Sequence, residues 1–175
     1  MRDERGIEAL RYYLLRHIGS HHDGDFTLER LHAVYESELA NQLGNLLARV
    51  VKLQRRHNVS AATHSKLAGD LVERTLTSVL DFECHLALRD IWDVVSATNA
   101  YVSSSEPWKL AKGGAQEELD EVLGELCATL FNIGHALAPL LPRTSTAILD
   151  ALQYPDNETT QLFPRNRYAG NFALK

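Results

Sequence analysis

The side chains best suited to bind another molecule lie on one expected helix in the first third of the chain. Asn45 and Arg49 are four positions apart, and at about 100° per residue the same helical face also takes Lys52 and Arg56. Amide and guanidinium groups can hydrogen-bond the edges of splayed RNA bases, and cations can contact phosphates. The pattern is therefore compatible with an RNA-binding face. A solvated helix face without a ligand has the same spacing and is the more common case.

A tryptophan beside a helix break is the second candidate. Trp108 follows Pro107, which ends the preceding helical pattern and can open a short helix as a first-turn residue. An indole exposed at such a junction can stack on an unpaired base. Spacing alone favours the other interpretation, a core tryptophan that covers one end of a bundle, because most tryptophans are largely buried. Trp92 lies in the strongest apolar stripe and is predicted to be core.

One segment is rich in side chains that can bind metals, namely His17, His21, His22, Asp23 and Asp25. Their spacing matches no zinc pattern, so a surface loop without a metal is the prediction. No phosphate-binding glycine-rich loop and no nucleophile with its base is present elsewhere. The sequence therefore predicts no catalytic residue and no cofactor.

Apolar residues recur at helical spacing through most of the chain, and no hairpin pattern interrupts them. Thr27 is a suitable N-cap, and Gly113-Gly114 predicts a break. The residues after Thr27 form one long helix or two with a break near Ser37. Helices are expected over residues 6–18, 28–53, 67–80, 82–103, 116–138 and 144–152, with a short one from Trp108. The economical architecture is all-α, an antiparallel helical bundle.

Composition suits one soluble domain. The chain has 175 residues, 45% of them hydrophobic and 23% charged. No apolar run approaches the roughly 20 residues of a membrane helix, and two cysteines fit a reducing, cytoplasmic setting. The net charge of −5 argues mildly against a nucleic-acid partner, but no acidic residue occurs from Leu39 to Gly69. This polarised distribution allows one local positive surface.

Six segments, in this order, resemble the part of methionyl-tRNA synthetase that follows its catalytic core. They are residues 9–16 (ALRYYLLR), 23–26 (DGDF), 37–49 (SELANQLGNLLAR), 106–112 (EPWKLAK), 137–142 (LAPLLP) and 162–165 (LFPR). The resemblance implies a helical bundle of the class I aminoacyl-tRNA synthetase anticodon-binding type. It also implies that Asn45, Arg49 and Trp108 read the CAU anticodon of methionine tRNA. Lys52 and Arg56 are then expected to contact the RNA backbone.

The resemblance divides the chain into three parts. Residues 1–26 look like the connection to the catalytic domain, residues 27–153 like the anticodon-binding bundle, and residues 154–175 like an irregular tail. The family's His-Ile-Gly-His and Lys-Met-Ser-Lys-Ser motifs do not occur, so no reaction is expected of the chain on its own. It would be part of a methionine-tRNA ligase only together with a catalytic domain, and a separate synthetase catalytic chain is one expected partner. The alternative is a protein-interaction module that docks on a partner.

A surface exposed by the missing catalytic domain is a further expectation. In the family, the first helix packs against that domain. The expected exposed apolar residues are Tyr12, Tyr13, Leu15 and the Leu162-Phe163 pair, which would favour self-association or a partner chain.

Overall fold

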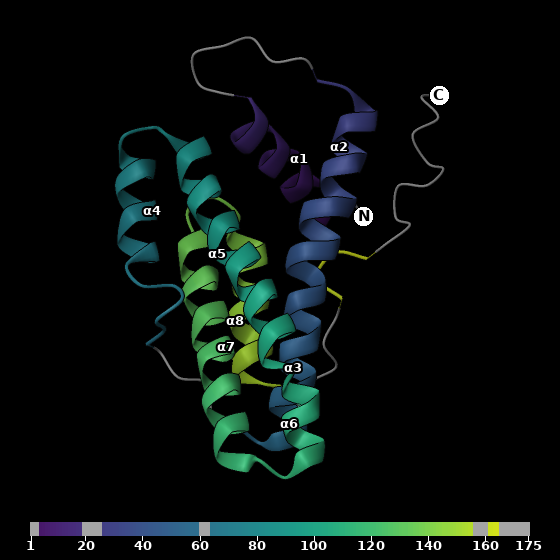
Figure 1. Cartoon of the computed structure of the whole chain (residues 1–175). Coiled ribbons are helices and arrows are strands. Elements are labelled where there is room, and N and C mark those ends of the chain that lie inside the picture. The colour runs from purple at the N-terminus through teal and green to yellow at the C-terminus, as the bar shows by residue number, and fades with distance from the viewer. Residues whose placement is uncertain (1–3, 19–25, 60–63, 156–160, 165–175) are drawn as a thin grey trace.

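Helices account for the fold of the described chain, and no strand occurs within it. The computed structural model describes residues 4–18, 26–59, 64–155 and 161–164 (Figure 1). The helices are α1 (Glu4–His17), α2 (Leu28–Val34), the π-helix η1 (Tyr35–Gly44), α3 (Asn45–His57), α4 (Leu71–Leu80), α5 (Cys84–Ser105), α6 (Pro107–Gly113), α7 (Gln116–Leu137) and α8 (Pro142–Gln153). The predicted all-α bundle is confirmed. None of the described helices is long and apolar enough to cross a membrane.

The segments α2, η1 and α3 form one continuous rod (Figure 1). Thr27 caps its start, as predicted, by accepting a hydrogen bond from the Arg30 backbone N–H. The suspected break near Ser37 is a change of helix type, because the π-helix begins at Tyr35 without interrupting the rod. The Ser37 hydroxyl donates to the Ala33 carbonyl at 2.6 Å, a back-bond that locally perturbs helices. Asn58 ends the rod in the left-handed conformation.

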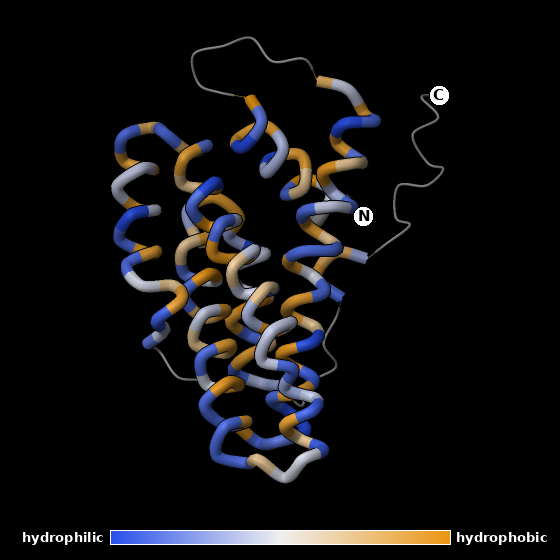
Figure 2. Tube along the Cα trace, in the orientation of Figure 1, coloured by the Kyte–Doolittle hydropathy of each residue, from blue (hydrophilic) through white to orange (hydrophobic). Residues whose placement is uncertain are grey.

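The core lies where the rod meets α5 and α7, and α8 packs along α7. Hydropathy along the trace shows the apolar stripes of these helices turned toward one another (Figure 2). The buried side chains at the centre include Leu43, Leu46, Val50, Ile91, Val95, Leu126, Leu130 and Ile133. Trp92 is buried among them, as predicted. Burying this apolar surface is the main force that holds the rod against the other helices.

The fourth helix begins four residues later than expected. The Glu125 carboxylate of α7 accepts hydrogen bonds from the backbone N–H of Leu67 and of Lys66 and from the Ser65 hydroxyl. These bonds hold the 65–70 segment in a turn, so α4 starts only at Leu71. Burial by itself raises the pKa of Glu125, but these three donors, together with the Thr129 hydroxyl, outweigh it and the pKa is lowered.

The first helix buries the side that was expected to be exposed. Tyr12, Tyr13, Leu162 and Phe163 are all buried, so the predicted composition of the exposed patch is wrong; Leu15 is partly buried. Tyr12 packs on Trp92, with ring centroids 4.4 Å apart, and its hydroxyl donates to Glu38. Helix α1 does carry exposed apolar side chains, but on its other side. They are Ile7, Leu10 and Leu14, and Phe26 before α2 is also exposed.

Helix α1 is also hydrogen-bonded to helix α8. The buried Glu8 carboxylate accepts hydrogen bonds from the backbone N–H of Arg143 and of Thr144 and from the Thr144 hydroxyl. A carboxylate at this place satisfies donors in the first turn of α8, which would otherwise be unpaired at the helix start. Residues 4–18 are therefore anchored to the bundle.

Candidate nucleic-acid interface

Helix α3 presents its polar residues on one side and packs with the other. Leu46, Leu47 and Val50 are buried against the bundle. Asn45, the first residue of α3, is partly exposed. The remaining polar residues of the predicted face, Arg49, Lys52 and Arg56, are exposed. The predicted division of this helix into a packed and a solvent side is confirmed.

The Trp108 junction is formed by an unusual turn. Helix α5 ends at Ser105, and Glu106 adopts a left-handed conformation with φ of 43°. Pro107 then occupies the first turn of α6, as expected, because its missing N–H would be unpaired there in any case. The Lys109 ammonium forms an ion pair with the Glu106 carboxylate at 2.7 Å. Helix α6 packs beside α7, and the chain reverses only in the connection between α6 and α7 (Figure 1).

Trp108 is exposed rather than sealed in the bundle. Its side chain keeps 38% of its surface accessible, so the interpretation as a core residue, which spacing alone favoured, is wrong. The physical reason is the Glu106-Pro107 turn, which ends the apolar stripe of α5 and places residue 108 in the first turn of a new helix. An accessible indole is the state that base stacking requires.

Two candidate residues from different elements meet at this place. The Arg49 guanidinium lies over the Trp108 ring, 5.5 Å from its centroid, in a cation–π contact. Asn45 stands one helical turn before Arg49 on the same side of α3. No carboxylate of the described chain forms an ion pair with Arg49. The bundle thus brings an amide, a guanidinium and an exposed indole to one surface.

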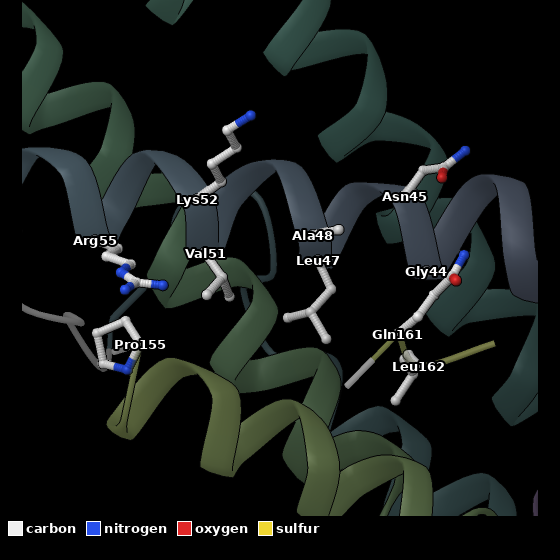
Figure 3. A pocket seen from close by; sticks show the side chains of 10 residues that line it. All are labelled: Gly44, Asn45, Leu47, Ala48, Val51, Lys52, Arg55, Pro155, Gln161 and Leu162. Atoms are coloured by element: carbon white, nitrogen blue, oxygen red, sulfur yellow. The ribbon is translucent and has the colours of Figure 1, made fainter. Parts of the chain in front are cut away.

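Sequence reasoning missed a cavity on the other flank of Asn45. It has a volume of about 720 Å³ and lies between α3 and a short segment around residues 161–162 (Figure 3). Arg55 and Gln161 take part in its lining, and neither was a candidate. Arg55 belongs to the acid-free stretch, which was the available signal, but it lies off the helix face defined by Asn45. Gln161 gives no local signal.

The histidine-rich segment is described only in part. His21, His22, Asp23 and Asp25 lie outside the described residues. His17 is described, and its imidazole lies 3.6 Å from the Glu38 carboxylate. Within the described ranges, no group of three histidine, cysteine or carboxylate side chains is placed to hold a metal ion.

Comparison with known proteins shows what this chain is similar to. A family model described as tRNA synthetases class I (M) matches residues 1–51. The methionine–tRNA ligase of Streptococcus pneumoniae serotype 4 is 34% identical over 160 residues, 84% of this chain and 24% of that protein. The corresponding ligase of Fusobacterium nucleatum is 32% identical over 169 residues, 90% of this chain and 26% of that protein. The chain therefore spans about a quarter of the length of the curated relatives it matches.

Solved structures give the same relationship. The Mycobacterium tuberculosis methionyl-tRNA synthetase in complex with methionyl-adenylate superposes with a TM-score of 0.76 at 25% identity, over 91% of this chain and 38% of that one. The free form of the same synthetase also reaches a TM-score of 0.76, at 24% identity, over 91% of this chain and 39% of that one. The second likeness shows the fold alone.

Proposed function

Because this chain is a partial-length relative of the methionyl-tRNA synthetase family, we propose that it is a tRNA-binding module that recognises the CAU anticodon of methionine tRNA. The observation that carries the proposal is the contact between the Arg49 guanidinium and the exposed Trp108 ring, with Asn45 one turn away. Three side-chain chemistries that suit an unpaired base are thereby joined on one surface.

Each side chain has a distinct part in this proposal. The Trp108 indole stacks on a splayed anticodon base. Asn45 and Arg49 donate or accept hydrogen bonds at base edges, which carry the sequence information. Lys52 and Arg56 contact phosphates, and the absence of acidic residues from Leu39 to Gly69 keeps repulsion of the RNA backbone low.

In this proposal, the chain does not catalyse a reaction by itself. It supplies anticodon recognition to a methionine-tRNA ligase only together with a catalytic domain. The exposed Ile7, Leu10 and Leu14 side chains of α1 favour a protein contact on that helix. They are the observation behind the second candidate function, a module that docks on a partner such as a separate catalytic chain.

A binding titration tests the proposal. The purified chain is mixed with a methionine-tRNA anticodon stem-loop and with the same stem-loop carrying a changed anticodon. Tryptophan fluorescence reports binding, and Trp92→Phe isolates the Trp108 signal. We expect the CAU loop to bind at least tenfold more tightly than the changed loop. Asn45→Ala and Arg49→Ala should reduce this ratio, because base-edge hydrogen bonds account for it. Equal affinity for both loops would contradict anticodon recognition.

A further inference from the structure

Helices α3 and α6 share α7 as a neighbour, but they do not pack along each other. Both α3 and α6 pack on α7, whereas no comparable packing joins α3 to α6 in the described chain. The Arg49 guanidinium of α3 nevertheless lies over the Trp108 ring of α6, 5.5 Å from its centroid. This contact therefore links the side chains of two helices whose backbones are held separately.

The backbone at Trp108 is anchored, whereas its side chain is not held by burial. Pro107 is buried beside the left-handed turn at Glu106, which fixes the start of α6. The neighbouring Lys109 ammonium is engaged with the Glu106 carboxylate at 2.7 Å. The indole keeps 38% of its surface exposed and rotates about two side-chain bonds. Exposed side chains exchange between rotamers within nanoseconds unless a neighbour holds them.

Arg49 is suited to hold this ring. Its side chain is exposed, and no carboxylate of the described chain forms an ion pair with it. A cation over an exposed indole favours that arrangement about two- to fivefold. A stacked guanidinium uses its flat face, so its in-plane N–H groups remain donors for a base edge. Holding the ring and reading a base are thus compatible.

We propose that Arg49 is a positioning residue for Trp108. Its guanidinium supports the indole and holds the ring in the orientation in which the accessible remainder of the ring takes a base. An indole that already has this orientation in the free protein binds more tightly, in proportion to the fraction of molecules that are competent. This inference rests on the proposed RNA-binding function and adds a role of Arg49 that acts through Trp108.

A double-mutant cycle tests the dependence of one side chain on the other. Arg49→Ala removes both roles of Arg49 in the starting protein, but only its base-edge role in Trp108→Ala. We expect the loss of affinity caused by Arg49→Ala to be about two- to fivefold smaller in the Trp108→Ala background. The probe is the CAU stem-loop with a fluorescent label, and its anisotropy reports binding. Independent side chains would give equal losses in the two backgrounds.

A conservative variant separates the two roles. In Arg49→Lys, an ammonium can still lie over the indole, but the planar fork that donates two bonds to a base edge is lost. We expect Arg49→Lys to keep most of the coupling with Trp108 and to lose discrimination between the CAU loop and the changed loop.

Fluorine NMR tests the positioning role without RNA. In protein labelled with 5-fluorotryptophan, the Trp108 signal is assigned by its loss in Trp108→Phe. Arg49→Ala should shift or broaden this signal and leave the signal of the buried Trp92 in place. Lys52→Gln is the control, because it removes an exposed charge one turn along α3, and it should leave the Trp108 signal unchanged.

The outcomes separate the two levels of the argument. If Arg49→Ala leaves the Trp108 signal unchanged, or if the losses of affinity in the double-mutant cycle are equal, Arg49 does not position the indole, while a stacking role of Trp108 stands. If the starting protein shows no affinity for the stem-loop, the proposed RNA-binding function fails and the positioning role fails with it.

Discussion

Two arginine–tryptophan contacts lie in different parts of this molecule and differ in what surrounds them. Arg16 lies over Trp92, 5.3 Å from the ring centroid, and Arg49 lies over Trp108 at 5.5 Å. Arg16 also forms an ion pair with the Glu38 carboxylate at 2.8 Å, and Trp92 is buried. Around Arg49 no ion pair is found in the described chain, and Trp108 is exposed.

The difference shows how one pair of residue types can serve structure or binding. At Arg16, the guanidinium pairs with the Glu38 carboxylate and donates to the Leu88 carbonyl, so both of these partners come from within the fold. At Arg49, the charge and the indole keep accessible surface for another molecule. Water can hydrate the exposed Arg49–Trp108 pair in the free protein, whereas the Arg16–Trp92 pair depends on its protein partners. Stability should therefore depend on the first pair and ligand affinity on the second.

The largest expected effect is on stability. Glu38→Ala leaves Arg16 and the Tyr12 hydroxyl without their acceptor in a partly buried place, and we expect it to lower the free energy of unfolding by about 2–3 kcal/mol. Arg49→Ala removes an exposed side chain and should change that free energy by less than about 0.5 kcal/mol. Urea unfolding followed by circular dichroism measures both. Similar losses in the two variants would remove the distinction between the two pairs.

The next effect is on RNA affinity. Trp108→Ala should weaken binding of the CAU stem-loop by about one to two powers of ten, since stacking on an indole is worth about 1–3 kcal/mol per base. Its unfolding midpoint should change little, because the indole is exposed. Trp92→Phe serves as the control and should leave the affinity unchanged. A strong loss of stability in Trp108→Ala would instead indicate a packing role.

A smaller effect concerns salt. Each phosphate contact contributes about −0.7 to the slope of log affinity against log salt for a single strand. Lys52→Gln and Arg56→Gln should each reduce the magnitude of the slope by about that amount. Arg74→Gln is the control, because Arg74 is already paired with Asp70 and Asp90 on the other side of the bundle. An unchanged slope in both test variants would place the RNA away from this face.

Most of the fold follows from local signals, and the exceptions have tertiary causes. Thr27, Pro107 and Gly114 mark helix ends by chemistry that needs no distant partner. The late start of α4 could not be predicted, since it depends on Glu125, which lies far along the chain. The exposed side of α1 was misassigned because apolar residues occur on both of its sides. Ile7 and Tyr12 both count as apolar positions in the pattern, and only packing decides which of them is buried.

The candidate site was predictable to a similar degree. The polar face of α3 follows from helical period alone. The meeting of Arg49 with Trp108 does not, because it joins side chains of α3 and α6, two helices that are far apart in the sequence. Family resemblance, rather than spacing, placed the two residues together. The cavity beside Arg55 is closed on one side by residues 161–162, which lie more than a hundred positions later in the chain. No local sequence pattern predicts that they lie there.

The smallest expected effect is a pH dependence at the first pair. Burial is the main cause that lowers the pKa of His17, the Glu38 carboxylate opposes it, and Arg16 adds to the lowering. The unfolded chain therefore takes up a proton at His17 near pH 6.5, at a pH where the folded protein still resists it. This contribution to stability is present above about pH 6.5 and is lost as the pH falls through the window below it.

His17→Gln should accordingly flatten the fall in unfolding free energy between about pH 7 and 5. The exposed His64→Gln is the control and should keep the slope of the starting protein. Unfolding in urea at a series of pH values measures the slopes, and a steeper fall in His17→Gln would mean that the attraction of Glu38 outweighs burial. The Arg49–Trp108 pair contains no histidine, so the same pH range should leave the ratio of affinities between the two stem-loops unchanged.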